Sequence, residues 1–474
     1  MKKNFVIKAL ALFIVAFMLL AGCGPAADNT SSDAGNTDGT QSSGGSTATD
    51  IMSIEMPTRD LSNNDKVLTM YTWTSLEENY FDGEAIKYFQ QEFGVKIEPT
   101  ISTHEAYWTD YAKMVAAGNA PDIIDLEYSS FWPLPVSNSL FQTWEGHIDF
   151  STPLWADVQH LLERYKWKDK IYYPAFGEFV AGWFFYNKAT FQNYGLESDT
   201  PLELYKRDEW TLDKLVELSD TFIEKNNKNE IVHWGFGQQE YEVFHISGIQ
   251  PFEVKNGTEY KNNLGDAKIA KVMNAMNKMS KGLGSGSWTA ADISPAFLNE
   301  TVGMMFNYSN ILTNASYADF IADDILGLAP YPKLDENSKY NIQMVVDPGY
   351  GLSNVQGANT ELAALFIEYL KWFKLGENVC REVPTTQNNP AKQKYNLKQV
   401  IGSVSLSEEM VNTVNSILDA ENTDIVYNDY QSIIRHASDF DLFKYSIFSG
   451  EAAWSTVLQQ LNPRYEAILK DYVK

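Results

Sequence analysis

The sequence is poor in cysteine, histidine and basic residues. Its 474 residues include two cysteines and six histidines, and 37 lysines and arginines stand against 62 aspartates and glutamates, giving a formal net charge of −25. This charge argues against nucleic acid and anionic lipid as surfaces that the protein binds electrostatically. The histidines lie far apart and show no metal-ligand spacing. We therefore expect no metal, no cofactor and no nucleic-acid partner.

The motifs of common catalytic and nucleotide-binding sites are also missing. The sequence contains no His-Glu-x-x-His, no Cys-x-x-Cys, no phosphate-binding loop ending in Gly-Lys-Ser/Thr and no Gly-x-Ser-x-Gly nucleophile elbow. The glycine-rich segment 282–286 follows a predicted helix, whereas a dinucleotide fingerprint follows a strand. Carboxylates are so numerous that pairs suited to a glycosidase always occur. An enzyme is disfavoured by these absences without being excluded.

An apolar run near the start is too short to span a membrane. Ala9 to Ala21 is apolar throughout and follows a basic start, and as a helix it would rise about 20 Å, less than the roughly 30 Å of a hydrocarbon core. This layout predicts a secretory signal over residues 1–22. Leu20-Ala21-Gly22-Cys23 resembles a bacterial lipobox, so we predict that Cys23 is lipidated and becomes the mature N-terminus.

The segment after Cys23 has the composition of a flexible tether. Almost every residue from Pro25 to Asp50 is Ala, Asp, Asn, Gly, Ser or Thr, which cannot bury enough apolar surface to fold. We predict that residues 23–63 hold a folded body at the outer face of the cell membrane. With Cys23 acylated, Cys380 has no intrachain partner, so we expect no disulfide. The roughly 420 remaining residues exceed one ordinary core and predict two domains.

A β-α-β-α-β order opens the folded part. The hydrophobic periodicity predicts strands at 67–73, 95–98 and 123–126, and helices at 81–93 and 107–117. Gly94 and Gly118 follow the two helices and fit their C-terminal caps. This alternation is typical of an α/β fold with a parallel sheet covered by helices. Further along, we expect strands at 182–187, 301–308 and 325–329, helices at 212–224, 264–281 and 361–375, and mostly helix from Ser407 on.

Several segments, in order and spacing, resemble family 1 extracellular solute-binding proteins, the maltose-binding protein-like sugar receptors of ABC importers. The matching segments are Ala116–Ile124, Lys170–Pro174, Phe185–Phe191, Glu209–Leu215 and Phe297–Phe306. Asp169-Lys170 stands where the family usually has Gly-Lys, and Asn299-Glu300-Thr301 replaces another Gly-Lys. The resemblance implies a two-lobe periplasmic-binding-protein-like (type II) α/β fold with an interlobe cleft and a hinge.

The resemblance also implies an organisation and a function. One lobe would comprise residues 64–170 and 345–390, and the other residues 171–344 and 391–474. The protein would capture a carbohydrate, with an oligosaccharide favoured, and deliver it as a monomer to the permease subunits of an ABC importer. Two alternatives stay open at this point: a membrane-tethered polysaccharide-degrading enzyme and a surface adhesion or scaffold protein.

Sugars present apolar faces ringed by hydroxyls, so their sites combine aromatic platforms with carboxylates. Trp73 ends the first strand, Glu178 lies where the family often places a ligand carboxylate, and Tyr308 falls at the family's stacking position. A packed or solvated side chain is the alternative at each position. The candidate ligand-binding residues are Trp73, Glu127, Tyr128, Glu178, Glu240, Tyr241, Tyr308, Asp347 and Tyr350.

Overall fold

The computed structural model describes residues 53–76, 82–103, 106–126, 131–237, 243–280, 290–378, 408–427, 429–430, 433–434 and 452–473. All of these residues fall within one compact unit. The predictions for the signal, for residues 23–52 of the tether and for Cys380 lie outside the described residues, as do four candidate site residues, Glu127, Tyr128, Glu240 and Tyr241. The last part of the predicted tether, residues 53–63, is described and packs against the folded body: Arg59 Nη2 lies 3.0 Å from Glu368 Oε2, and the Trp372 indole donates to the carbonyl of Ile54. Within the described part, no helix is long and apolar enough to cross a membrane.

One sheet has the strand order β2-β1-β3-β13-β4. Its strands are β1 (Val67–Thr72), β2 (Lys96–Ile101), β3 (Ile123–Asp125), β4 (Phe141–Gln142) and β13 (Tyr350–Ser353). β1 runs parallel to both β2 and β3, as the sequence predicts. β13, which joins this sheet from far along the sequence, runs antiparallel to β3 and to β4.

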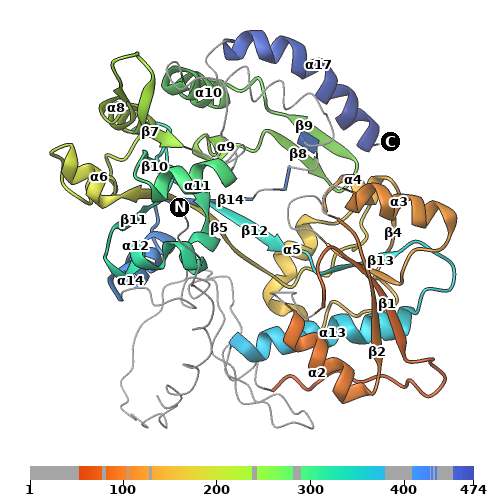
Figure 1. The fold of residues 1–474 in the computed structure, drawn as a ribbon. Helices are drawn as coiled ribbons and strands as arrows, with labels where there is room; N and C mark the ends of the chain where they lie inside the picture. Colours follow the sequence, from red (N-terminus) through yellow and green to blue (C-terminus); the bar gives the residue numbers. More distant parts are fainter. Residues whose placement is uncertain are drawn as a thin grey trace, which may run out of the picture. The chain divides into compact units, whose positions relative to one another are not determined.

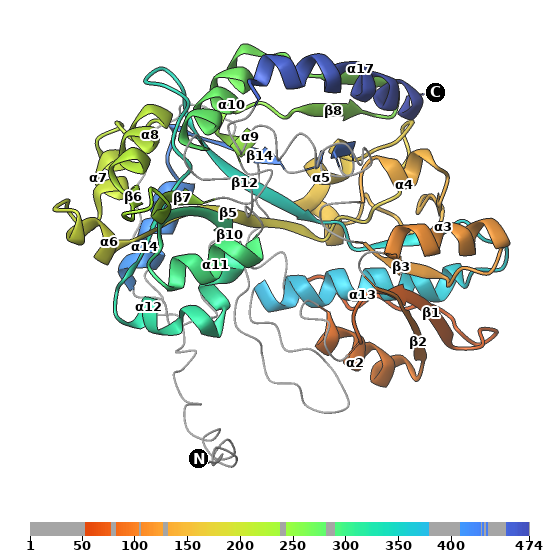
Figure 2. The ribbon, with the colours of Figure 1, turned by 45° about the horizontal axis from the view of Figure 1, so that its top comes forward.

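Helices cover this sheet. α2 (Gly83–Phe93) and α13 (Thr360–Asn378) lie side by side (Figures 1 and 2), with the rings of Tyr88 and Phe373 stacked 6.0 Å apart. α3 (Tyr107–Ala117) has the predicted bounds and ends at Gly118, whose φ of 71° suits glycine. The shorter helices of this region are α4 (Leu134–Ser137), η1 (Pro153–Val158) and α5 (Gln159–Arg164).

The turn before β3 is held by a carboxylate, as its Pro-Asp sequence predicts. Asp122 Oδ2 accepts hydrogen bonds from the backbone N–H of Thr69 at 2.8 Å and from its hydroxyl at 2.7 Å. Asp122 Oδ1 accepts the backbone N–H of Asn359 at 2.7 Å. The carboxylate of Asp122 thus joins β1, β3 and the start of α13. The Pro121-Asp122 turn is therefore part of the scaffold.

The second sheet has the order β14-β12-β5-β10-β7-β6, and β11 also pairs with β5. Its strands are β5 (Gly177–Asn187), β6 (Glu224–Lys225), β7 (Ile231–Gly237), β10 (Val302–Tyr308), β11 (Leu326–Ala329), β12 (Tyr340–Asp347) and β14 (Thr423–Tyr427). β10 and β12 run antiparallel to β5, while β7 and β14 run parallel to β10 and β12. The carboxyl ends of β7, β10, β12 and β14 therefore point toward the edge at which β5 begins.

Helices of the second part begin at polar caps where the sequence provides them. Asn187 Oδ1 accepts the N–H of Thr190 at the start of α6 (Lys188–Asn193), and Thr211 Oγ1 accepts that of Lys214 at the start of α8 (Leu212–Thr221). The other helices are α7 (Thr200–Lys206), α9 (Val243–Ile246), α10 (Ala267–Ser280), α11 (Ala290–Leu298), η2 (Ser309–Thr313), η3 (Ala315–Tyr317), α12 (Ala318–Ala322), α14 (Glu408–Leu418) and α17 (Trp454–Tyr472).

A separate hairpin, β8 (Phe252–Lys255) and β9 (Glu259–Asn262), lies under α17 (Figures 1 and 2), to which Tyr260 and Asn262 are hydrogen-bonded. Two sequence predictions are corrected in this half of the chain. β5 begins at Gly177, five residues before the predicted strand, because its pairing with β12 extends that far. β14 is a strand in a region predicted to be mostly helical, because it pairs with β12.

Candidate functional site

The candidate site lies where the strand ends of the two sheets meet. β12 of the second sheet ends at Asp347, and β13 of the first sheet begins at Tyr350, so only Pro348 and Gly349 separate them. Tyr350 pairs with Asp125, the last residue of β3, and Asp347 pairs with Gly177, the first residue of β5. In open α/β sheets, ligands bind outside the carboxyl ends of the strands. This junction is therefore the expected place for a ligand.

A lysine from α13 gathers carboxylates at the junction. Lys374 Nζ lies 2.5 Å from Asp347 Oδ2 and 2.9 Å from Asp82 Oδ1. The Tyr350 hydroxyl donates to the other oxygen of Asp82 at 2.8 Å. Burial alone would lower the pKa of Lys374, but the two carboxylates raise it overall, which keeps the ammonium charged.

A third carboxyl group of this cluster holds its proton near neutral pH. Asp125 lies at the carboxyl end of β3, and burial raises its pKa to about 8, with further increases from the charges of Asp82 and Asp347. Thr72 Oγ1 lies 3.4 Å from Asp125 Oδ2. Since only one ammonium faces three acids, a neutral Asp125 avoids an additional uncompensated charge in a buried place.

A second lysine of α13 contacts the other chain segment that joins the two sheets, the segment that leads into β5 at Gly177. Lys371 Nζ lies 2.7 Å from Asp157 Oδ2 and donates to the carbonyl of Phe176 at 2.9 Å. Its side chain is 1% exposed, and this burial lowers its pKa although Asp157 opposes the change. Phe176 immediately precedes β5, so α13 contacts both links through lysines one helical turn apart.

Glu178, next to the start of β5, is held at both carboxylate oxygens. His160 Nε2 lies 3.3 Å from Oε1, and the Tyr427 hydroxyl donates to Oε2 at 2.6 Å. Burial would raise the pKa of Glu178, but these two hydrogen bonds lower it overall. The hydrogen bond with Glu178 raises the pKa of His160 in turn. The result is an oriented, ionised carboxylate, which is a strong acceptor for hydroxyl donors.

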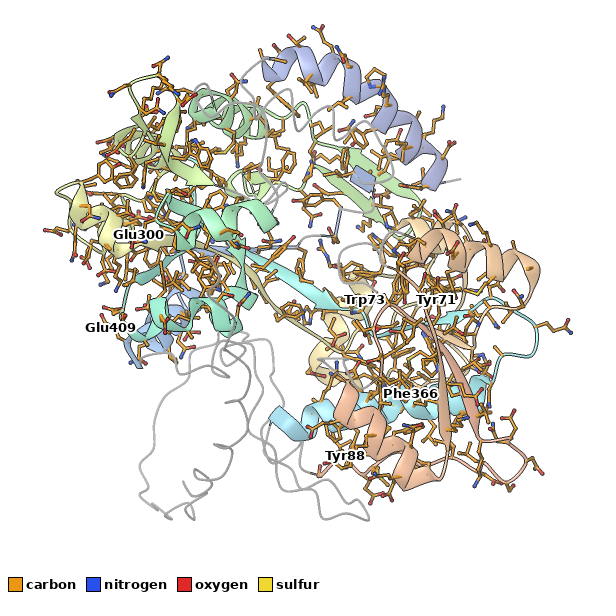
Figure 3. All side chains as sticks on the ribbon, viewed as in Figure 1. Tyr71, Trp73, Tyr88, Glu300, Phe366 and Glu409 are labelled. Atoms are coloured by element: carbon orange, nitrogen blue, oxygen red, sulfur yellow. The ribbon has the colours of Figure 1, made fainter. Side chains whose placement is uncertain are left out.

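The structure gives the other candidates different surroundings. Trp73 directly follows β1 and is 41% exposed, so it is no core residue. Figure 3 shows it beside Tyr71 and away from Tyr88 and Phe366, which lie on the helices that cover the sheet. An exposed indole at a strand end is suited to lie against an apolar ligand face.

Tyr308 ends β10, pairs with Gly182 of β5 and is half-buried, so it lies further along β5 than Glu178. Asp347 is 18% exposed at its side chain and engaged by Lys374. Tyr350 is a correction: it is completely buried and its hydroxyl is bonded to Asp82, so it supports the junction and presents no surface to a ligand.

Sequence reasoning missed the residues that position these candidates. Asp82, Asp125 and Lys374 complete the acidic cluster, while His160 and Tyr427 fix Glu178. Of these residues, only Asp125 could have been found from the sequence. It ends an apolar strand, and burying a carboxylate costs free energy unless the group is paired or protonated. The described residues include no group of histidine, cysteine, aspartate or glutamate that could hold a metal ion.

Two helix-covered sheets that are joined at their strand ends by short links define the class of two-lobe solute-binding proteins. The chain belongs to the bacterial extracellular solute-binding protein family, whose model matches residues 84–371, more than half of the sequence. The fold class predicted from the sequence is confirmed. The family consists of binding proteins that act outside the cytoplasm.

Solved structures show the same fold at low sequence identity. An ABC substrate-binding protein from Listeria monocytogenes in complex with cycloalternan has a TM-score of 0.59 and 14% identity, covering 86% of this chain and 100% of that chain. A Thermotoga lettingae solute-binding protein bound with α-D-tagatose has a TM-score of 0.58 and 16% identity, covering 85% and 100%. The maltotriose-bound maltose/maltodextrin-binding domain of Bdellovibrio bacteriovorus has a TM-score of 0.56 and 13% identity, with the same coverage. Among curated protein sequences, none matches the chain.

Proposed function

We propose that the protein binds a carbohydrate at the junction of the two sheets and delivers it to an ABC importer. The observation that carries this proposal is that each sheet carries one sugar-type contact at a strand end: an exposed indole, Trp73, after β1, and a fixed carboxylate, Glu178, at the start of β5. An aromatic face and a charged acceptor are what sugar rings and hydroxyls require. The sugar ligands named for the similar structures, cycloalternan, tagatose and maltotriose, support the same class of ligand.

The proposed lobes follow the two sheets. One lobe comprises residues 64–170 and 345–390, and the other residues 171–344 and 391–474. The assignment is supported by strand membership, since β1 to β4 and β13 share one sheet while β5, β7, β10, β12 and β14 share the other. Only at β12 do the two differ, because its last three residues, Val345–Asp347, belong to the second sheet and lie past the proposed boundary. The links at Phe176 and Asp347 would then act as hinges. A ligand that contacts both lobes shifts the population toward the closed form by as much as it prefers that form.

Binding alone, without catalysis, is the activity that we propose. A glycosidase needs two carboxyl groups about 5–9.5 Å apart on opposite sides of the scissile bond. The carboxylates grouped at the junction are instead neutralised by Lys374 or protonated, which suits a structural role. Incubation with oligosaccharides should release no reducing ends. Measurable release would replace this proposal with that of a tethered polysaccharide-degrading enzyme.

We also propose a lipid anchor at Cys23, outside the described residues. One acyl chain binds a membrane only marginally, whereas two chains anchor stably, and the segment after Cys23 has the composition of a loose tether. Cys23→Ala should release the protein from the cell surface and leave its ligand affinity unchanged. A parallel loss of affinity would show that anchor and binding site are not separate.

A thermal-unfolding screen of the protein with monosaccharides and oligosaccharides would identify the ligand. A ligand at 100 times its Kd should stabilise the native state by about 2.7 kcal/mol and raise the melting temperature. The panel should include tagatose, glucose, mannose, maltotriose and mannotriose, with spermidine and glycerol phosphate as non-sugar comparisons. If only a non-sugar solute raised the melting temperature, the proposal that the ligand is a carbohydrate would be wrong.

A further inference from the structure

A groove of about 720 Å³ adjoins the residues that hold Glu178. His160 and Tyr427, whose side chains contact the two oxygens of Glu178, both line it. Its apolar residues include Trp132, Phe252 and Ile433, each nearly fully buried. The other walls come from α5, from the β8–β9 hairpin and from β14, so the groove extends from His160 and Tyr427 along segments that the candidate site does not include.

An ion pair in this groove retains free hydrogen-bonding capacity. Arg164 donates from Nε at 3.0 Å and from Nη2 at 2.7 Å, both to Asp429 Oδ2, and the Tyr165 hydroxyl lies 3.3 Å from that same oxygen. Among the described residues, no hydrogen bond reaches Asp429 Oδ1 or Arg164 Nη1. The guanidinium lies over the Tyr427 ring at 4.3 Å from its centroid, which fixes its plane. One acceptor and one donor are therefore held in a single rigid unit.

The charges around the groove are nearly balanced, unlike those of the whole chain, which carries a net charge of −25. The ionisable residues that line it are Arg164, Lys166, Lys255, Lys261, Glu163, Glu253 and Asp429, together with His160. Four permanent cations disfavour a polyamine or a metal ion as ligand. A phosphate would find Arg164 already neutralised by Asp429. A neutral ligand rich in hydroxyls fits these paired charges best.

We propose that this groove is a further subsite for the same saccharide, in which a vicinal pair of hydroxyls donates to Asp429 Oδ1 and accepts from Arg164 Nη1. The inference rests on the proposed function, because it assigns to one ligand both the contact at Glu178 and the contacts in the groove. It names the ligand class more closely: an oligosaccharide whose further rings extend from Glu178 toward β14 and the β8–β9 hairpin.

Two variants test the groove in different ways. Asp429→Asn removes the charged acceptor while keeping its shape. Ile425→Trp adds bulk at a groove-lining residue that is 53% exposed, so it fills the groove without disturbing a packed core. Val232→Trp is the matched control, because Val232 is 47% exposed and does not line the groove.

Calorimetric titration of each variant and of the wild type uses maltotriose and mannotriose against glucose and mannose. The wild type should bind its preferred trisaccharide more tightly than the corresponding monosaccharide. Asp429→Asn and Ile425→Trp should each weaken trisaccharide binding roughly 10- to 100-fold and change monosaccharide binding less than about twofold, while Val232→Trp changes neither.

Three results would overturn the subsite and leave sugar binding at Glu178 in place. The groove variants could lose equal affinity for trisaccharide and monosaccharide, or both could bind the trisaccharide as tightly as the wild type does. The third result is a wild type that binds trisaccharides no more tightly than monosaccharides. Binding of no saccharide at all by the wild type would overturn the proposed function, and the subsite with it.

Discussion

The backbone N–H of Phe176 donates a hydrogen bond to the backbone carbonyl of Asp347, with 2.9 Å between nitrogen and oxygen. These two residues belong to the two described links between the sheets, so the links are bonded to each other. α13 holds both, because Lys371 contacts the Phe176 carbonyl and Lys374 contacts the Asp347 carboxylate. The hinge that we propose is therefore a single unit built around one helix.

Replacing Lys374 should destabilise the protein strongly. Lys374→Met leaves Asp82 and Asp347 buried beside Asp125 without a compensating ammonium, and loss of one partner of a buried ion pair costs about 3–5 kcal/mol. Urea unfolding measures the change in the free energy of unfolding. Lys339→Met is the control, since Lys339 and Asp424 are about half-exposed and their pair should contribute under about 1 kcal/mol. Similar losses in the two variants would contradict the role given to Lys374.

Asp125 should make the protein less stable as the pH rises. Burial raises its pKa from 3.8 to about 8, so between these values the folded protein keeps a proton that the unfolded chain has lost. The free energy of unfolding then falls with pH by up to about 1.4 kcal/mol per unit from this group. The groups that face Asp125 are Asp82, Asp347, Lys374 and Thr72.

Asp125→Asn cannot lose a proton, so the variant should lack this part of the pH dependence. Urea unfolding of wild type and variant at pH 5 and pH 7 should show the stability of the variant increasing relative to the wild type. If the difference between the two proteins stayed constant over this range, Asp125 would be ionised in the folded state at both pH values.

Glu178→Gln should weaken ligand binding without unfolding the protein. The substitution removes the charge that His160 and Tyr427 orient, and a hydrogen bond to a charged group is worth about 1.5–3 kcal/mol, which corresponds to a loss of roughly 10- to 100-fold in affinity. Titration with the saccharide found by thermal screening measures this loss. Glu217→Gln, at an exposed position on α8, serves as the control. Unchanged affinity in Glu178→Gln would remove this carboxylate from the binding site.

Gly235→Ala should destabilise the second sheet. A Cβ at this position of β7 would clash with the backbone carbonyl of Ser219 in α8, so a strand or helix has to move. Overpacking of this kind costs about 1–3 kcal/mol. Gly265→Ala is the control, because a Cβ there would meet no atom within 4 Å. Equal unfolding free energies of the two variants would show that β7 and α8 can separate at no cost.

The sequence predicted best where local signals decide the structure. α3 has its predicted bounds because its apolar periodicity ends at Gly118, whose left-handed conformation stops the helix. β14 could not be predicted in the same way. Its residues Thr423–Tyr427 become a strand because they pair with β12, about 80 residues earlier in the chain, and such pairing leaves no local pattern.

The same distinction between local and long-range signals applies to the candidate site. Glu178 was predicted from its place after a matching segment, but its partner Tyr427 lies 249 residues away in the sequence. The cluster around Lys374 draws Asp82, Asp125 and Asp347 from separate elements. Of its members that the sequence analysis missed, only Asp125, at the end of an apolar strand, carried a signal in the sequence. That Tyr350 is buried also follows from this clustering, because its hydroxyl is bound to Asp82.

The most direct test of carbohydrate binding at the junction is a calorimetric titration of wild type and Trp73→Ala with the saccharide that stabilises the protein most. Loss of stacking on an exposed indole should weaken binding roughly tenfold or more, since aromatic contacts of this kind contribute on the order of 1 kcal/mol beyond their buried area. The account predicts saturable binding by the wild type and this loss in the variant. Undiminished binding by Trp73→Ala, or no heat of binding for any saccharide in the wild type, would contradict it.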